Sequence, residues 1–203
     1  YKRQVQYTTL IGYAAGGAIN HADASNTTAV GWKAGNALTQ GRYSTMVGFE
    51  SGLTMTTSDG NTAVGYRAMR ETRANGDYNT AIGYQAMIAN VIDEDVNYCV
   101  AVGAGTFAAA MESETSGSVA VGYQALSALT SGASNTVVGF DGAKGITTGS
   151  YNVVMGYASL DAADGGESNN ISIGTNAMGS INHDDSDHNV VIGDSALLGG
   201  TGT

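Results

Sequence analysis

The sequence predicts an all-β protein, a parallel β-solenoid of about eleven coils with 17–20 residues each. Three observations predict it: one motif recurs at a nearly constant spacing, 30 glycines occur without any proline, and apolar residues keep fixed places around one glycine of each motif. Repeats of this length are typical of solenoids, because each unit buries its apolar surface only against its neighbours. Without proline, every backbone N–H can join a hydrogen-bonded ladder.

The motif is clearest at 61–66 (Asn-Thr-Ala-Val-Gly-Tyr), 79–84 and 118–123. Its glycine serves as the reference for each repeat. These reference glycines are Gly12, Gly31, Gly48, Gly65, Gly83, Gly103, Gly122, Gly139, Gly156, Gly174 and Gly193. The repeat predicts a single β-solenoid domain over 1–203. Neither end reads as a polar cap, so we expect a segment of a longer fibre.

The three residues before each glycine predict a strand that is apolar on both faces. The first and third are β-branched throughout except for Met155, and the second is mostly alanine or valine. We expect the β-branched columns to fill the lumen, and the small column to meet a partner that approaches closely. This predicts an obligate homo-oligomer, most simply a homotrimer around one axis.

The remaining repeated positions indicate where the chain turns and which side chains stack from coil to coil. The reference glycine is expected to end the strand, where a Cβ is not tolerated or φ is positive. Aromatic residues follow eight of the glycines and occupy five positions five residues before a glycine, so we expect their rings to stack along the rod. Asparagine recurs four residues before the glycine, and its amide can bond the equivalent residue one coil away.

Composition excludes several function classes. The net charge of -10 argues against nucleic acid or an anionic membrane surface as a partner. No segment has the ~20 apolar residues needed for membrane insertion. Cys99 is the one cysteine, which excludes an intrachain disulfide and suggests a small core residue. No nucleophile–base pair or phosphate-binding loop stands out, so we expect no enzyme, no catalytic residues and no cofactor.

The units at 61–69 (Asn-Thr-Ala-Val-Gly-Tyr-Arg-Ala-Met) and 118–126 (Ser-Val-Ala-Val-Gly-Tyr-Gln-Ala-Leu) resemble repeats of bacteriophage tail-fibre proteins. They are also similar to the head domains of trimeric autotransporter adhesins. The resemblance implies left-handed coils, a trimer and no catalytic residues. The period and the aromatic after the glycine favour the tail-fibre type.

That resemblance implies a structural and receptor-binding segment of an extracellular fibre. The first expectation is a virion tail fibre that binds a host cell-surface glycan or protein. The alternative is a bacterial surface adhesin or another extracellular fibre subunit.

Acidic residues gather between the motifs: only Glu50, Asp141 and Asp194 of the 18 lie within or next to one. Such variable loops on a rigid scaffold are where recognition is expected. One of them offers candidate ligands for a divalent cation, against the simpler interpretation of a solvated acidic loop. The candidates are His183, Asp184, Asp185, Asp187 and His188.

Three further alternatives are weaker. Asp161, Asp164 and Glu167 could supply paired carboxylates for glycan cleavage by a tailspike, but they lie in a loop beside alanine and glycine. The aromatic columns could stack on sugars rather than seal corners. Ranks of threonine on a flat solenoid could bind ice, but we expect the threonine column inside the coil.

Overall fold

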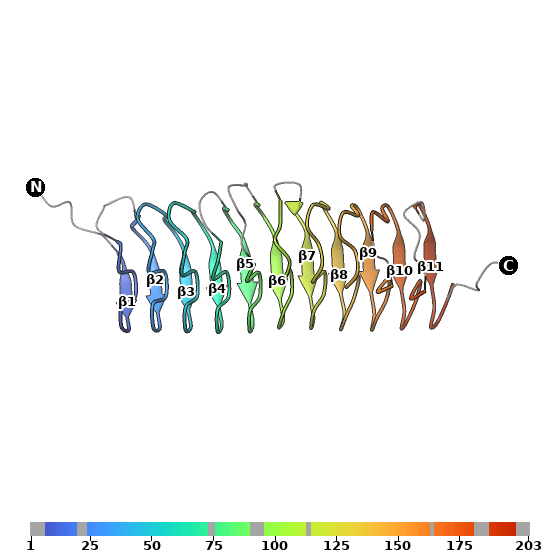
Figure 1. The fold of residues 1–203 in the computed structure, drawn as a ribbon, viewed down its shortest axis with the longest axis horizontal. Helices are drawn as coiled ribbons and strands as arrows, with labels where there is room; N and C mark the ends of the chain where they lie inside the picture. Colours follow the sequence, from blue (N-terminus) through green and yellow to red (C-terminus); the bar gives the residue numbers. More distant parts are fainter. Residues whose placement is uncertain are drawn as a thin grey trace, which may run out of the picture.

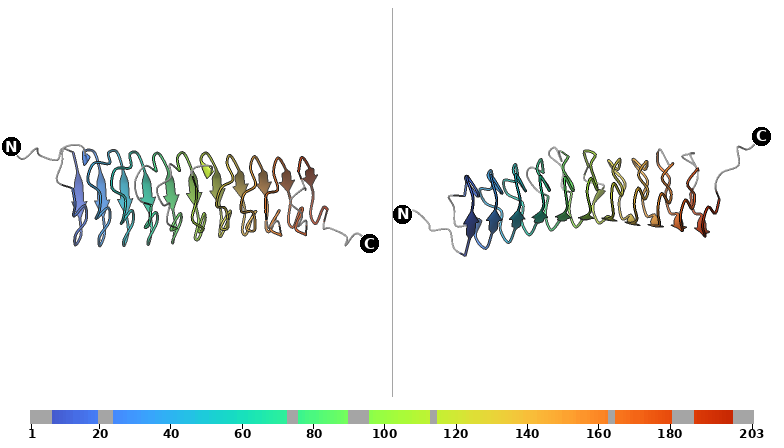
Figure 2. Two further views of the ribbon diagram at one scale, coloured as in Figure 1. Left: turned by 45° about the horizontal axis from the view of Figure 1, so that its top comes forward. Right: turned by 90° about the horizontal axis from the view of Figure 1, so that it is seen from below.

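The chain forms a single parallel sheet that runs along a rod (Figures 1 and 2). A computed structural model describes residues 7–19, 24–72, 76–89, 96–112, 115–162, 165–180 and 187–197. The strands are β1 (Thr9–Ile11), β2 (Thr28–Val30), β3 (Thr45–Val47), β4 (Thr62–Val64), β5 (Thr80–Ile82), β6 (Val100–Val102), β7 (Val119–Val121), β8 (Thr136–Val138), β9 (Val153–Met155), β10 (Ile171–Ile173) and β11 (Val190–Ile192).

Each strand pairs in parallel with the next strand in the sequence, so the sheet order is β1 to β11. The register is constant: the three residues before one reference glycine pair with the same three of the next repeat. This confirms the all-β parallel β-solenoid. No helix in the described part of the chain is long and apolar enough to cross a membrane.

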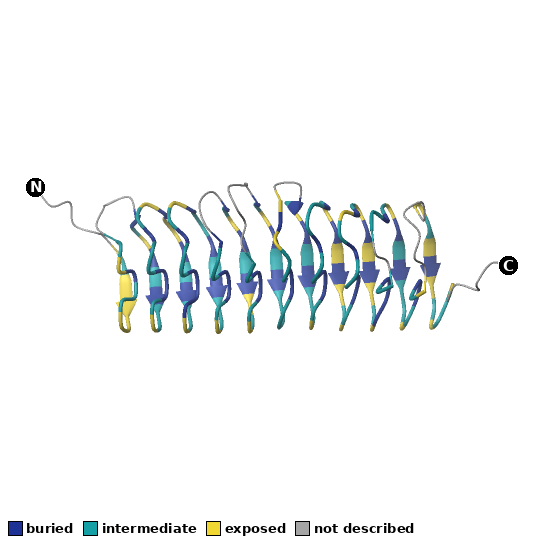
Figure 3. Ribbon diagram, viewed as in Figure 1, coloured by how far each residue is buried: buried dark blue, intermediate teal, exposed yellow. Residues whose placement is uncertain are grey.

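The prediction of which strand face lies inside was wrong (Figure 3). The middle residue of β2 to β11 is only 0–8% exposed, whereas the first and third residues are partly or fully exposed. The small column therefore fills the lumen and the β-branched columns face outward. The alternation of side chains fixes which residues share a face, but both faces are apolar here and the pattern does not say which is enclosed.

The lumen is narrow, which explains why alanine dominates the inward column. The chain after the corner returns close behind the sheet and packs buried residues against the strand. They are small at the third position after the glycine, as in Ala34 and Ala68, and include larger side chains at the fourth, as in Met69, Phe107 and Leu126. A larger inward strand residue in every coil would not fit between these layers.

Asparagine stacks on asparagine beside the strand, as expected from the sequence. The side-chain oxygen of Asn61 accepts the backbone N–H of Asn79 at 2.8 Å, and that of Asn152 accepts the N–H of Asn170 at 3.0 Å. These side chains are buried, so each bond satisfies a backbone donor that water cannot reach.

The reference glycines stack directly on one another at the corner after each strand. Gly103 has φ +136°, and a Cβ at this residue would collide with the carbonyl oxygen of Gly122 in the next coil. This confirms that a Cβ is not tolerated there. The close approach lets the backbone ladder continue through the corner, where Gly122 donates to Val102 at 2.8 Å.

We predict that Gly103→Ala lowers the free energy of unfolding by about 3 kcal/mol, since the Cβ meets backbone and φ is strained. Gly105→Ala is the matched control. It also has a positive φ of +67°, but its Cβ would meet only Gln124 Cγ at 3.4 Å. It should cost about 1 kcal/mol. Urea unfolding followed by circular dichroism measures both, and equal losses would contradict the stacking argument.

Candidate functional site

The outward face of the sheet is a continuous uncharged surface. Its two columns are threonine or aliphatic, and no residue in the described strands is charged. With about 4.8 Å between strands and about 3.3 Å per residue, the 11 strands present about 500 Å². Ile11, Met155 and Ile192 are among its exposed large side chains. This face was expected inside, and its exposure makes it the largest candidate interaction surface.

A ladder of stacked rings lines the corner directly after the strands. Ring centroids lie 6.2 Å apart for Tyr13–Trp32, 4.7 Å for Trp32–Phe49, and 5.3 Å for both Phe49–Tyr66 and Tyr66–Tyr84. Interplanar angles in this run are 7–16°. The rings are all exposed at their edges. The predicted ladder is therefore confirmed over this run.

The ladder is interrupted at Ala104 and resumes at Tyr123. Tyr123 and Phe140 lie 4.8 Å apart, and Phe140 and Tyr157 lie 5.5 Å apart. Thr175 and Asp194 then occupy the ring position in the last two repeats. The ladder thus has two runs, separated by a single coil without a ring.

A second aromatic column lies on the other side of the strands. Tyr78 and Tyr98 stack at 5.6 Å with an angle of 4° between their planes. Tyr7, Tyr43 and Tyr151 hold equivalent positions, and all five tyrosines are exposed and have positive φ. Left-handed backbone is rare for tyrosine, so these corners are fixed by the surrounding stack rather than by local preference.

Cations lie over several rings of the first ladder. Lys33 Nζ is 4.4 Å from the centre of the Trp32 ring, and the Arg67 guanidinium is 5.0 Å from that of Tyr66. Such contacts contribute about 0.5–1 kcal/mol at exposed sites. They hold long side chains along the ladder and reduce its hydrophobic character at that end.

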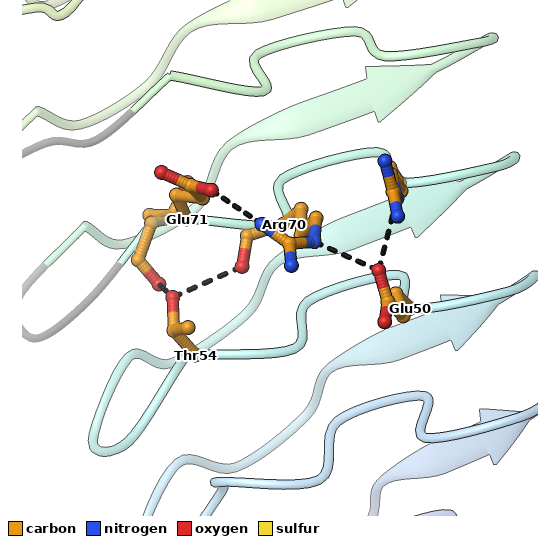
Figure 4. A network of polar contacts seen from close by, with 6 residues as sticks. Glu50, Thr54, Arg70 and Glu71 are labelled. Atoms are coloured by element: carbon orange, nitrogen blue, oxygen red, sulfur yellow. Dashed lines mark hydrogen bonds and ion pairs between the residues drawn. The ribbon is translucent and has the colours of Figure 1, made fainter.

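Glu50 anchors the same corner through a charged network (Figure 4). Its Oε2 accepts from Arg70 Nε at 2.8 Å and from Arg67 Nε at 2.9 Å, and Arg70 also bonds Glu71. Burial alone would raise the pKa of Glu50, but the hydrogen bonds and charges of Arg70 and Arg67 outweigh burial and hold that pKa below its usual value. The network joins neighbouring coils and has a structural role.

The predicted cation ligands are only partly within the described residues. His183, Asp184 and Asp185 lie outside them. The carboxylate of Asp187 accepts the backbone N–H of Ser168 at 2.6 Å, and the N–H of His188 bonds the Ser168 carbonyl at 3.2 Å. Among the described residues no group of three or more His, Cys, Asp or Glu side chains could hold a metal ion.

The three carboxylates considered for glycan cleavage do not form an exposed pair in the described residues. Asp164 lies outside them. The Glu167 side chain is fully buried: Oε2 accepts the N–H of Gly165 at 3.3 Å, and Oε1 has no partner there. Burial raises the pKa of Asp161, and the nearby Asp141 carboxylate adds to this. A carboxylate enclosed like Glu167 does not reach a polymer on the surface.

Cys99 is buried, as expected for a core residue. It takes the place of an asparagine in the stacked column, and its thiol lies 3.3 Å from the carbonyl oxygen of Thr115. Burial raises the pKa of this thiol, which keeps it protonated and inert.

Comparisons with family models, with curated proteins and with solved structures found no match for this chain. The candidate site therefore rests on the outward strand face and the two aromatic columns. The positions of the aromatic columns were predicted from the sequence, but the prediction of which strand face points outward was wrong. The sequence also showed that Ala104 interrupts the first aromatic column. The consequence of this interruption depends on how the rings on either side of it are placed.

We predict that Glu50→Gln lowers the free energy of unfolding at neutral pH by about 2 kcal/mol, because two charge-assisted hydrogen bonds are weakened. A carboxylate whose folded pKa is lowered stabilises the fold above its unfolded pKa. That contribution is lost as the pH falls through the folded pKa. The difference between Glu50→Gln and the wild type should therefore shrink at acidic pH.

Glu71→Gln is the control for this experiment, since its more exposed carboxylate also bonds Arg70. It should change stability little at any pH. Urea unfolding over a pH series measures all three proteins, and a Glu50→Gln difference that stays constant with pH would contradict the assignment.

Proposed function

We propose that this chain is a structural and receptor-binding segment of a trimeric fibre, most simply a phage tail fibre that attaches to a host cell surface. In this proposal three left-handed coils assemble side by side in an extracellular rod, without catalysis or a cofactor. The observation that carries it is the uncharged outward strand face, lined on both sides by exposed aromatic columns.

The size of that face supports assembly. Its strands present about 500 Å², which is the size of the largest apolar patch on a typical monomer, about 300–600 Å², and such a patch is often functional. A stable interface buries about 800 Å² on each partner. A second and third copy of the chain would supply surfaces of the same length and the same coil spacing.

The aromatic columns support a role in attachment. Rigid tyrosine and tryptophan side chains lose little entropy on binding and suit protein and sugar partners. The repeats at 61–69 and 118–126 that resemble tail-fibre and adhesin modules agree with this role. A bacterial surface adhesin would use the same surfaces, and the attachment partner distinguishes the two.

Ice binding is the second candidate, because the threonine column proved to face outward. The neighbouring column is aliphatic in every strand, and the threonine column itself is broken at five positions, Val100, Val119, Val153, Ile171 and Val190. These features favour burial against protein over the ordering of water.

We predict a solution mass of about three times the chain mass of 20.5 kDa, measured by sedimentation equilibrium. Val121→Lys, in the middle of the outward face, should dissociate the assembly, since it brings like charges together in an apolar contact. Ala110→Lys is the control. It adds the same charge at an exposed residue outside the strands and should leave the mass unchanged.

A stable folded monomer of the wild-type chain would refute the trimer. If solutions of that monomer also showed thermal hysteresis between freezing and melting, ice binding would replace the fibre as the proposed function. Adhesion of the fluorescently labelled trimer to bacterial cells tests the attachment role, and a trimer that adheres to no cell type in a broad panel would refute that role.

A further inference from the structure

The interruption of the first aromatic ladder is a missing side chain in an intact corner. The backbone ladder runs through it without a shift: Gly105 donates to the Tyr84 carbonyl at 3.0 Å, and Gln124 donates to the Ala104 carbonyl at 2.9 Å. The strands on both sides also keep their register. Ala104 therefore stands where the other coils of both runs carry a ring, and nothing else in the corner has moved.

The resulting slot has the height of one ring. Tyr84 and Tyr123 are two coils apart, so their ring centres lie about 10 Å from each other. A flat group placed midway would be about 5 Å from each ring. That is the spacing of the existing ladder, where centroids lie 4.7–6.2 Å apart. We name this space, bounded by Tyr84, Ala104, Gly105 and Tyr123, the ring slot.

Exposure agrees with an open slot on the Tyr84 side. Tyr84 is 55% exposed, whereas the four residues with a ring on each side are 38–47% exposed, namely Trp32, Phe49, Tyr66 and Phe140. Tyr123, at 45%, lies within that range. The coil of Ala104 contributes no long side chain to the floor of the slot, because Gly105 follows Ala104 where the neighbouring coils carry Gln85 and Gln124. Gln124 of the next coil borders this floor, since its Cγ would lie 3.4 Å from a Cβ on Gly105.

The interruption is distinct from the end of the ladder. Beyond Tyr157 the ring positions hold Thr175 and Asp194, so that end offers a ring on one side only. The ring slot has an aromatic residue on both sides, because Tyr84 and Tyr123 occupy the ring position in the coils before and after Ala104. That arrangement can hold a flat group from both sides.

The chemistry around the slot selects the occupant. None of its residues is charged, and the chain carries a net charge of -10, which disfavours phosphates and other anionic ligands. Gln124, whose Cγ lies beside Gly105, carries an amide that can both donate and accept hydrogen bonds. A pyranose ring has two apolar faces for the tyrosines and a rim of hydroxyl groups for such an amide. A bound aromatic hydrocarbon ring would form no hydrogen bond with this amide.

We infer that the ring slot binds a neutral pyranose of a cell-surface glycan, held between Tyr84 and Tyr123. This inference rests on the proposed attachment function and names the substrate class and the residues that would serve it. Tyr84 and Tyr123 supply stacking, Ala104 and Gly105 provide the space, and Gln124 contacts hydroxyl groups.

The test is binding of methyl glycosides of glucose, galactose, mannose and N-acetylglucosamine to the assembled protein, followed by saturation-transfer NMR and titration. At least one should bind the wild type. Ala104→Tyr completes the ladder and should weaken binding at least about tenfold, because the new side chain occupies the slot. Thr175→Tyr is the matched control. It adds the same side chain at the end of the ladder, beyond Tyr157, and should leave binding unchanged.

Tyr123→Leu provides a second variant that removes one wall without filling the slot, and it should also weaken binding if Ala104→Tyr fails to fold. Three results would overturn the inference: no methyl glycoside binds the wild type, Ala104→Tyr binds as well as the wild type, or N-acetyltyrosine amide displaces the sugar and binds more tightly. In each case an unchanged trimer mass and intact cell adhesion would leave the fibre proposal standing, whereas a monomer that does not adhere would refute that proposal itself.

Discussion

Successive coils are hydrogen-bonded in parallel with constant register, and every other feature depends on this stacking. It places each residue above its equivalent in the next repeat, about 4.8 Å away. Glycine then stacks on glycine at the corner, asparagine on asparagine beside the strand, and ring on ring along the outer edge. The corner glycines are the strictest part of this arrangement, because a Cβ at Gly103 would meet the backbone of the next coil.

The same stacking also leaves apolar side chains exposed to water. A coil with one three-residue strand has a narrow lumen that alanine can fill, so the β-branched residues are left outside. Repetition then turns two exposed side chains per coil into a long apolar surface. In the proposed fibre, coverage by further copies would remove that surface from water and would leave the corners and loops available for a partner.

Much of the fold could be predicted from the sequence. The spacing of the reference glycines gives the coil length, and the aromatic and asparagine columns give the ladders. The enclosed face could not be predicted, because both strand faces are apolar and only the packing of residues such as Met69 and Phe107 behind the sheet decides between them. The ionic network of Glu50 with Arg67 and Arg70 was also missed. Glu50 and Arg67 share the second position after the reference glycine, but the residues at this position vary in charge from repeat to repeat, so the column gave no signal.

The ring slot arises where one residue, Ala104, departs from the regular column of aromatic residues. Ala104 alone indicates no site, and it marks the proposed binding site only because it lies between Tyr84 and Tyr123. Assembly of the rod depends on coverage of the outward strand face, and oxidative cross-linking of Val121→Cys tests that coverage, with buried Cys99 unreactive. Coverage of this face by other copies predicts efficient disulfide-linked dimers at low protein concentration. A thiol at this position that stays free and reacts rapidly with a soluble reagent would contradict the account.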